Sequence, residues 1–70
     1  MLFINCSSVR ALSEHELISE KIALAIAKER KRGKGPFLYW RELSERVDCI
    51  DEKLQTLLED DPKVGLTSGA

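Results

Sequence analysis

Residues 37–58 read FLYWRELSERVDCIDEKLQTLL and decide the fold, because they carry two short helical patterns separated by a tight connection. In the first pattern Trp40, Leu43 and Val47 recur at positions i, i+3 and i+7. This is the spacing of one face of an α-helix. We therefore expect a short helix over residues 40–47.

The second pattern follows the connection Asp48-Cys49-Ile50. Asp51 belongs to the residue types that cap helix N-termini, because its carboxylate accepts backbone N–H bonds. It predicts a helix over residues 52–60. That helix ends before Pro62, since the residue preceding a proline avoids the helical region. Its expected inner face consists of Leu54, Leu57 and Leu58.

Upstream, the pattern predicts one long helix over residues 14–32. Ser13 and Glu16 have the S-x-x-E spacing of a capping box, in which each side chain accepts from the other residue's amide. Gly33 supplies a C-terminal stop. The apolar side of this helix is broad and consists of Leu17, Ile18, Ile22, Leu24, Ala25 and Ile26. Because one short motif cannot cover so wide an arc, we expect a homodimer.

Taken together, residues 37–58 resemble the helix-turn-helix core of winged-helix proteins. Ser44 matches the small residue at the helix crossing, and Cys49 matches the apolar position of the turn. Asp48 stands where the family favours a left-handed glycine, a conformation that Asp tolerates better than most residues. The resemblance implies that the helix over 52–60 is a recognition helix.

The remaining part of such a domain is a wing. Residues 62–68, PKVGLTS, look like its first strand. The sequence holds no later segment for a second wing strand. Residues 1–5 are apolar enough to replace it, either within the chain or in a second copy.

The resulting fold expectation is an α+β domain, mostly α, with three winged-helix-like helices and a short β element. A chain of 70 residues is long enough for one small domain. We expect a single domain over 1–70, with an N-terminal strand or arm over 1–12, a helical core over 13–61, and a wing strand and tail over 62–70.

Charge is strongly segregated, although the formal net charge is only −1. Five basic residues gather within residues 28–35, at the end of the long helix and just after it, where Glu29 is the one acid. Residues 36–70 instead carry eight acids against four basic residues. Charge asymmetry of this kind reports on partners rather than on fold.

The resemblance implies a small DNA-binding transcriptional regulator. Its expected phosphate contacts come from the basic run, which consists of Lys28, Arg30, Lys31, Arg32 and Lys34. Sequence preference would come from the exposed side of the recognition helix, through Lys53, Gln55 and Thr56. That helix also carries Glu52 and Glu59, which repel a polyanion.

This acidity keeps a second function class open. A protein-interaction adaptor or inhibitor would use the acidic face over residues 51–61 and would not bind nucleic acid. The two classes differ in geometry, because helix-turn-helix docking requires the basic run and the exposed side of 52–59 to share one surface.

Other features define what we do not expect. The size argues against an enzyme, and no residue cluster predicts a catalytic, cofactor or metal site. No apolar run approaches the length of a membrane span. Two cysteines are too few for a disulfide scaffold, so we expect reduced thiols in a cytoplasmic protein. We expect an exposed His15 and core positions for Cys49 and for the aromatic residues Phe3, Phe37, Tyr39 and Trp40.

Overall fold

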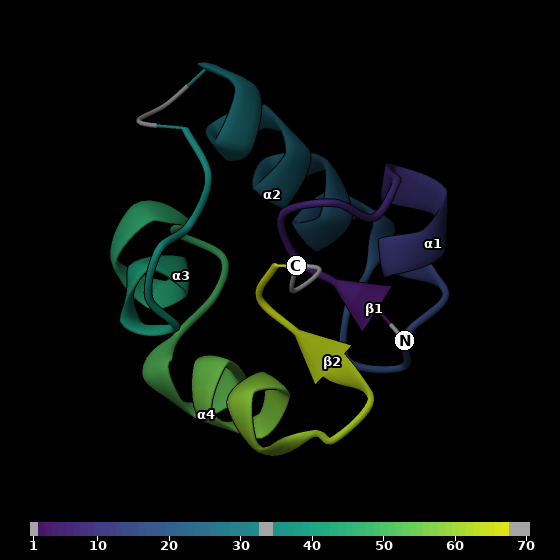
Figure 1. Cartoon of the computed structure of the whole chain (residues 1–70), viewed down its shortest axis with the longest axis vertical. Coiled ribbons are helices and arrows are strands. Elements are labelled where there is room, and N and C mark those ends of the chain that lie inside the picture. The colour runs from purple at the N-terminus through teal and green to yellow at the C-terminus, as the bar shows by residue number, and fades with distance from the viewer. Residues whose placement is uncertain (1, 33–34, 68–70) are drawn as a thin grey trace.

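The computed structural model describes residues 2–32 and 35–67. In these residues four helices and two short strands follow one another in the order β1, α1, α2, α3, α4, β2 (Figure 1). The strands are β1 (Leu2–Phe3) and β2 (Val64–Gly65), and the helices are α1 (Val9–Ser13), α2 (Glu20–Arg32), α3 (Arg41–Arg46) and α4 (Glu52–Asp60). The chain is therefore α+β and mostly α, as expected, with four helices rather than three over the described residues.

The sequence patterns located both helices of the motif. Helix α3 lies within one residue of the expected bounds at each end, and α4 has the expected bounds. The Asp51 carboxylate accepts from the Leu54 amide at 2.8 Å, so the predicted cap is confirmed. Leu43 and Val47 are buried, and the Ser44 hydroxyl donates to the Gln55 side chain at 2.7 Å where the helices meet.

The prediction of one helix over 14–32 was wrong in its first part. Ser8 caps the short helix α1, since its hydroxyl accepts from the Ala11 amide at 3.1 Å. Ser13 ends that helix, and its hydroxyl donates to the Arg10 carbonyl. Ser13 and Glu16 therefore form no capping box. The end of α2 at Arg32 agrees with the prediction, whereas the expected stop at Gly33 lies outside the described residues.

The turn between α1 and α2 is held by contacts distant in sequence. His15 Nε2 lies 2.8 Å from a carboxylate oxygen of Asp61, and His15 Nδ1 accepts from the Leu17 amide at 3.1 Å. His15 is consequently half-buried, not exposed as expected. The Lys63 amide, and then His15, hold the pKa of Asp61 below its usual range. Because these bonds tie the turn to the end of α4, the chain breaks its helix here.

Helix α1 also covers the apolar arc of α2. Leu12 of α1 and Ile18, Ala23 and Ile26 are buried together in the core. Leu24, expected on the inner face, is instead 52% exposed. The arc that motivated a dimer is thus covered within one chain except at Leu24, and the homodimer stays a prediction.

The two strands pair within the chain, so the N-terminal segment completes the β element in cis. The pairing is parallel, with Leu2 opposite Val64 and Phe3 opposite Gly65. Parallel neighbours need a crossover and cannot form a hairpin. All four helices lie in that crossover (Figure 1). The α1 helix therefore lies partly within the segment expected as an N-terminal arm, and the pair differs from a wing made by one hairpin.

Several smaller expectations were wrong. Asp48 does not adopt the left-handed conformation, since no described residue other than glycine has a positive φ. Cys49 is exposed, and the neighbouring Ile50 fills the apolar turn position instead. Tyr39 and Leu57 are exposed rather than internal. Phe37 is buried as expected, Trp40 is partly buried against the core, and Phe3 is partly buried.

We predict that Ser8→Ala lowers the free energy of unfolding by about 1 kcal/mol, because α1 loses the hydroxyl that caps it. Ser13→Ala is the matched control and should cost less than half as much, since Ser13 caps no helix N-terminus. Urea denaturation of both variants measures the difference. A larger loss of stability for Ser13→Ala than for Ser8→Ala would contradict this, and would favour Ser13 as the cap of a single helix over residues 14–32.

Candidate functional site

Arg46 is the centre of the polar contacts near α3. Its side chain, 10% exposed, pairs with Glu29 of α2 at 3.1 Å and with Glu42 of α3 at 3.2 Å. The guanidinium also donates to the Gly35 carbonyl at 2.6 Å and lies 4.3 Å from the centre of the Phe37 ring. One side chain thus joins α2, the connection before α3, and α3 itself.

Glu42 extends this arrangement to the start of α3. One oxygen of its carboxylate accepts from the Leu38 amide at 2.6 Å and from the Tyr39 amide at 3.0 Å, while the other faces Arg46. The Leu38 amide bond is the main cause that holds the pKa of Glu42 below its usual range, with the Tyr39 amide and Arg46 acting in the same direction against partial burial. The backbone of residues 38 and 39 is therefore held at two points.

The side chains on this fixed backbone point outward. Leu38 is 71% exposed and Tyr39 is 70% exposed. We call these two residues the apolar ledge. Large exposed apolar side chains that lie next to each other indicate an interaction surface, whereas single scattered ones do not. Their fixed backbone marks the apolar ledge as the first feature of a candidate docking surface.

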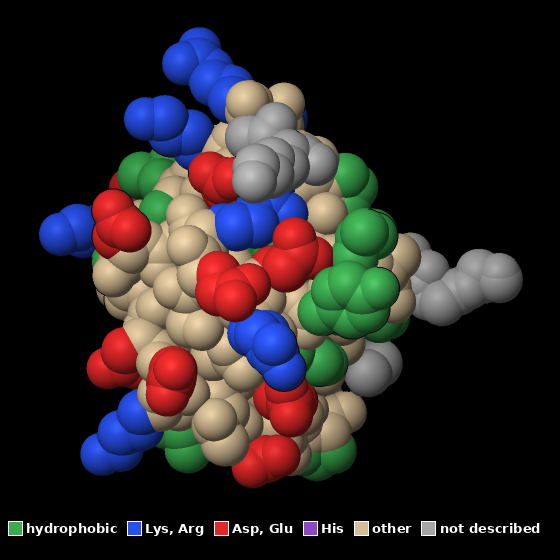
Figure 2. All heavy atoms as spheres, turned by 90° about the vertical axis from the view of Figure 1, so that its left-hand side faces the viewer, with side chains coloured by type: hydrophobic (Ala, Val, Ile, Leu, Met, Phe, Trp, Pro, Cys, Tyr) green, Lys and Arg blue, Asp and Glu red, His purple; other side chains and the backbone are tan. Residues whose placement is uncertain are grey.

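An open groove of about 970 Å³ adjoins the apolar ledge. Its apolar lining comes from the ledge together with Trp40 and Leu66. The polar lining comes from α3 and α4 and consists of Arg41, Glu42, Glu45, Gln55 and Glu59. Figure 2 shows this side of the molecule, with hydrophobic side chains gathered beside a field of acidic ones.

The expected phosphate-contacting residues divide into two groups. Lys28, Lys31 and Arg32 are exposed, and none pairs with another described side chain. Arg30 is partly buried and donates to the Ile4 carbonyl at 2.8 Å, which ties α2 to the segment after β1. Lys34 lies outside the described residues.

The expected base-contacting residues divide similarly. Lys53 is exposed on α4. Thr56 is exposed, but its hydroxyl donates to the Glu52 carbonyl of its own helix at 2.9 Å. Gln55 is half-buried and accepts from Ser44. Much of this set therefore already has a partner within the fold.

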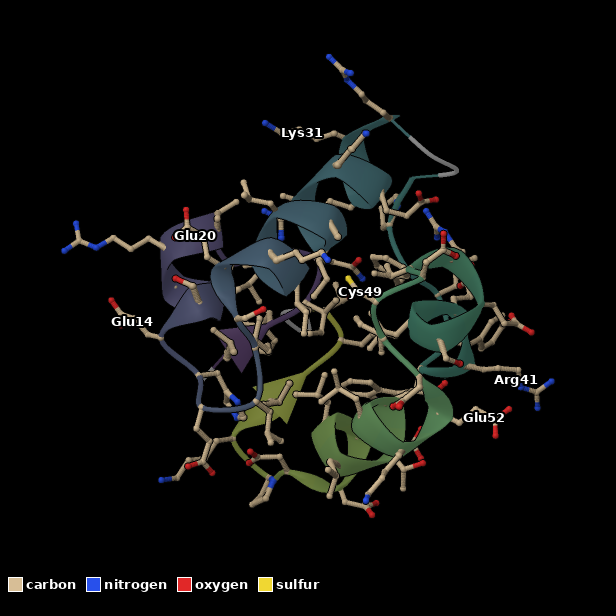
Figure 3. All side chains as sticks on the ribbon, turned by 180° about the vertical axis from the view of Figure 1, so that it is seen from behind. Glu14, Glu20, Lys31, Arg41, Cys49 and Glu52 are labelled. Carbon is tan, nitrogen blue, oxygen red and sulfur yellow. The ribbon has the colours of Figure 1, made fainter. Side chains whose placement is uncertain are left out.

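The basic end of α2 and helix α4 do not share a surface. Figure 1 is oriented with the longest axis vertical, and the C-terminal end of α2 lies at the top while α4 lies at the bottom. In Figure 3, seen from behind, Lys31 lies near the upper end of α2, whereas Glu52 at the start of α4 lies well below it at one side. The long dimension of the molecule is 28 Å. The expected phosphate-contacting and base-contacting groups thus lie at opposite ends.

Other candidate chemistry is sparse in the described part of the chain. Residues 2–32 and 35–67 contain no group of three or more His, Cys, Asp or Glu side chains placed to hold a metal ion. No helix among them combines the length and the apolar character needed to cross a bilayer. Cys49 lies on a smaller hollow of about 520 Å³, beside Lys21 and Lys28.

The chain matches no protein-family model, no curated protein and no solved structure. Sequence reasoning missed the roles of Leu38, Glu42 and Arg46. One signal was present, because Glu42 and Arg46 have the i, i+4 spacing of a helical ion pair and Glu42 follows Tyr39 by the three residues of a capping contact.

Acid titration tests the Glu42 contact. The lowered pKa means that the unfolded chain binds this proton more readily than the folded chain, so the contribution is complete above the unfolded pKa and disappears as the pH falls through the folded pKa. We predict that Glu42→Gln is less stable than the parent at pH 7, and that the gap narrows between about pH 5 and pH 3. Thermal unfolding across that range measures it. A gap that stays constant would show that the charge of Glu42 is irrelevant.

Proposed function

We propose that this protein is a protein-interaction module, an adaptor or inhibitor, that binds its partner through the apolar ledge and the groove between α3 and α4. The observation that carries the proposal is the exposure of Leu38 and Tyr39 on a backbone that Glu42 holds in place. Binding sites depend on a few well-placed apolar anchors. An anchor whose backbone is already ordered loses less conformational entropy when the partner binds.

The acidic residues of α4 favour this proposal over the docking of a helix-turn-helix motif on DNA. Helix α4 carries Glu52, Glu59 and Asp60 as exposed acids, with Lys53 as its one cation. A duplex presents a dense row of phosphates, which acids repel. The separation of the basic end of α2 from α4 removes the cations that would offset this repulsion. The winged-helix resemblance therefore concerns the succession of α3, turn and α4, and the DNA-binding role that it implies stays a prediction.

Photo-crosslinking tests the proposal. A benzophenone side chain at Arg41, on the rim of the groove, should give a discrete protein adduct in lysate of the source cells, and the adduct should disappear in the double variant Leu38→Ser/Tyr39→Ser. Both side chains are exposed, so this variant should keep its stability within about 1 kcal/mol. The matched control places the benzophenone at Arg10 of α1, on the other side of the fold (Figure 1). Equal adducts from both positions, or an adduct that survives the double variant, would contradict the proposal.

A second candidate function is favoured by one specific observation. Lys28, Lys31 and Arg32 form an exposed cationic end of α2. We propose that any contact of this protein with DNA is made there, through phosphates and without sequence preference. The DNA-binding regulator that the resemblance implies is therefore the second candidate function, because the residues expected to contact bases lie at the other end of the molecule.

We predict that Lys31→Ala/Arg32→Ala weakens DNA binding to all sequences alike and flattens its salt dependence by about two units of slope. Gln55→Ala should leave the ratio of affinities for different sequences unchanged, because its side chain bonds to Ser44. Fluorescence anisotropy with several unrelated duplexes at three salt concentrations measures both. If Gln55→Ala alone reduced the discrimination between duplexes, α4 would be a recognition helix.

A further inference from the structure

The acids along the groove differ in whether they already have partners. Glu42 is occupied by two amides and Arg46. Glu45 and Glu59 line the same groove, are exposed, and form no ion pair or side-chain hydrogen bond with another described residue. These two carboxylates remain available for a cation that comes from outside the fold.

The cations near the groove do not neutralise it. Arg41 is the one basic residue among the described residues that line it. The exposed acids Glu52 and Asp60 of α4 add to the negative charge on this side, and Lys53 is the one base of that helix. Figure 2 shows acidic side chains spread over this face, with basic ones both among them and at its margins. A ligand that fills the groove therefore meets an apolar ledge beside net negative charge.

From this pairing we propose that the occupant of the groove is a segment of another protein in which aliphatic or aromatic side chains alternate with Lys or Arg. The inference rests on the proposed function and specifies its partner. The apolar side chains would cover Leu38 and Tyr39, and the cations would pair with Glu45 and Glu59. Such complementarity mainly sets specificity and the rate of association.

The chain's own basic end is a poorer occupant. The exposed residues at the end of α2 are Lys28, Lys31 and Arg32, and the large apolar side chain exposed on the same helix is Leu24, one turn before Lys28. This end of one molecule would satisfy the acids of a second copy, but its single leucine would leave most of Leu38 and Tyr39 uncovered. Head-to-tail contacts of this kind also tend to continue into open chains. A second copy is therefore an outcome that the experiment must detect.

Selection from a displayed library of random 16-residue peptides against the whole chain tests the inference. We expect the selected peptides to be enriched in Lys and Arg next to Leu, Ile, Phe or Trp. Their affinity should fall about tenfold in Glu45→Lys/Glu59→Lys and at least tenfold in Leu38→Ser/Tyr39→Ser. Glu14→Lys/Glu16→Lys changes the net charge equally, at exposed positions of the turn after α1, and should change affinity less than twofold.

The outcomes separate the inference from the function on which it rests. Peptides that need Leu38 and Tyr39 but are neutral or acidic, and that ignore Glu45→Lys/Glu59→Lys, would overturn the basic partner and leave the binding module in place. Peptides that bind the Leu38→Ser/Tyr39→Ser variant unchanged would overturn both. Self-association at micromolar concentration in sedimentation, lost in both Leu38→Ser/Tyr39→Ser and Glu45→Lys/Glu59→Lys, would overturn the inference in favour of a second copy.

Discussion

The ion pairs of Arg46 are the interaction on which the C-terminal half of the fold depends. Its side chain is almost covered, and it satisfies Glu29, Glu42 and the Gly35 carbonyl at once. Removing one partner of a buried pair is costly, because the remaining charge keeps its desolvation without compensation. The connection between α2 and α3 turns at Gly35, whose φ of 86° is one that other residues rarely adopt. Arg46 and Gly35 together fix the path of the chain into α3.

The apolar ledge follows from this constraint. With Arg46 holding one oxygen of Glu42, the other oxygen is free to accept the two amides before α3. Phe37 is buried under the guanidinium, so the next two residues are directed outward. The backbone of Phe37 is fixed in turn by Asn5, which accepts from the Phe37 amide and donates to its carbonyl. The exposure of Leu38 and Tyr39 thus follows from contacts made by Asn5, which lies just after β1, and by residues of α2 and α3.

The parts of the fold that could be predicted from sequence are those with local causes. Asp51 and the spacing of Leu43 and Val47 act within one helix, so α3 and α4 were located almost to the residue. The break before α2 has a distant cause, since His15 reaches Asp61 across 46 positions. Ser13 and Glu16 gave a false local signal for a helix start there. No pattern within residues 14–19 shows that Asp61 lies opposite.

The candidate site was harder to predict for a related reason. Burial is the default expectation for Tyr39 and Leu57, yet both are exposed, because Phe37 and Leu58 already fill the core positions beside them. Gln55 belongs to the residue types that read bases, and only its bond to Ser44 shows that it helps to join two helices. The net charge of each segment could be summed from the sequence. Only the fold shows that the basic end of α2 and the acidic helix α4 lie at opposite ends of the molecule.

The placement of acidic residues beside the apolar ledge explains how the chain tolerates its exposure. An uncovered pair of large apolar side chains favours self-association, and a net charge close to zero does little to oppose it. Local charge matters more at the ledge. Glu45 and Glu59 lie on the same groove in every copy, so two ledges that meet face to face bring like charges together. The same carboxylates would attract a cationic partner, and one arrangement of charge therefore discourages the wrong contact while favouring the right one.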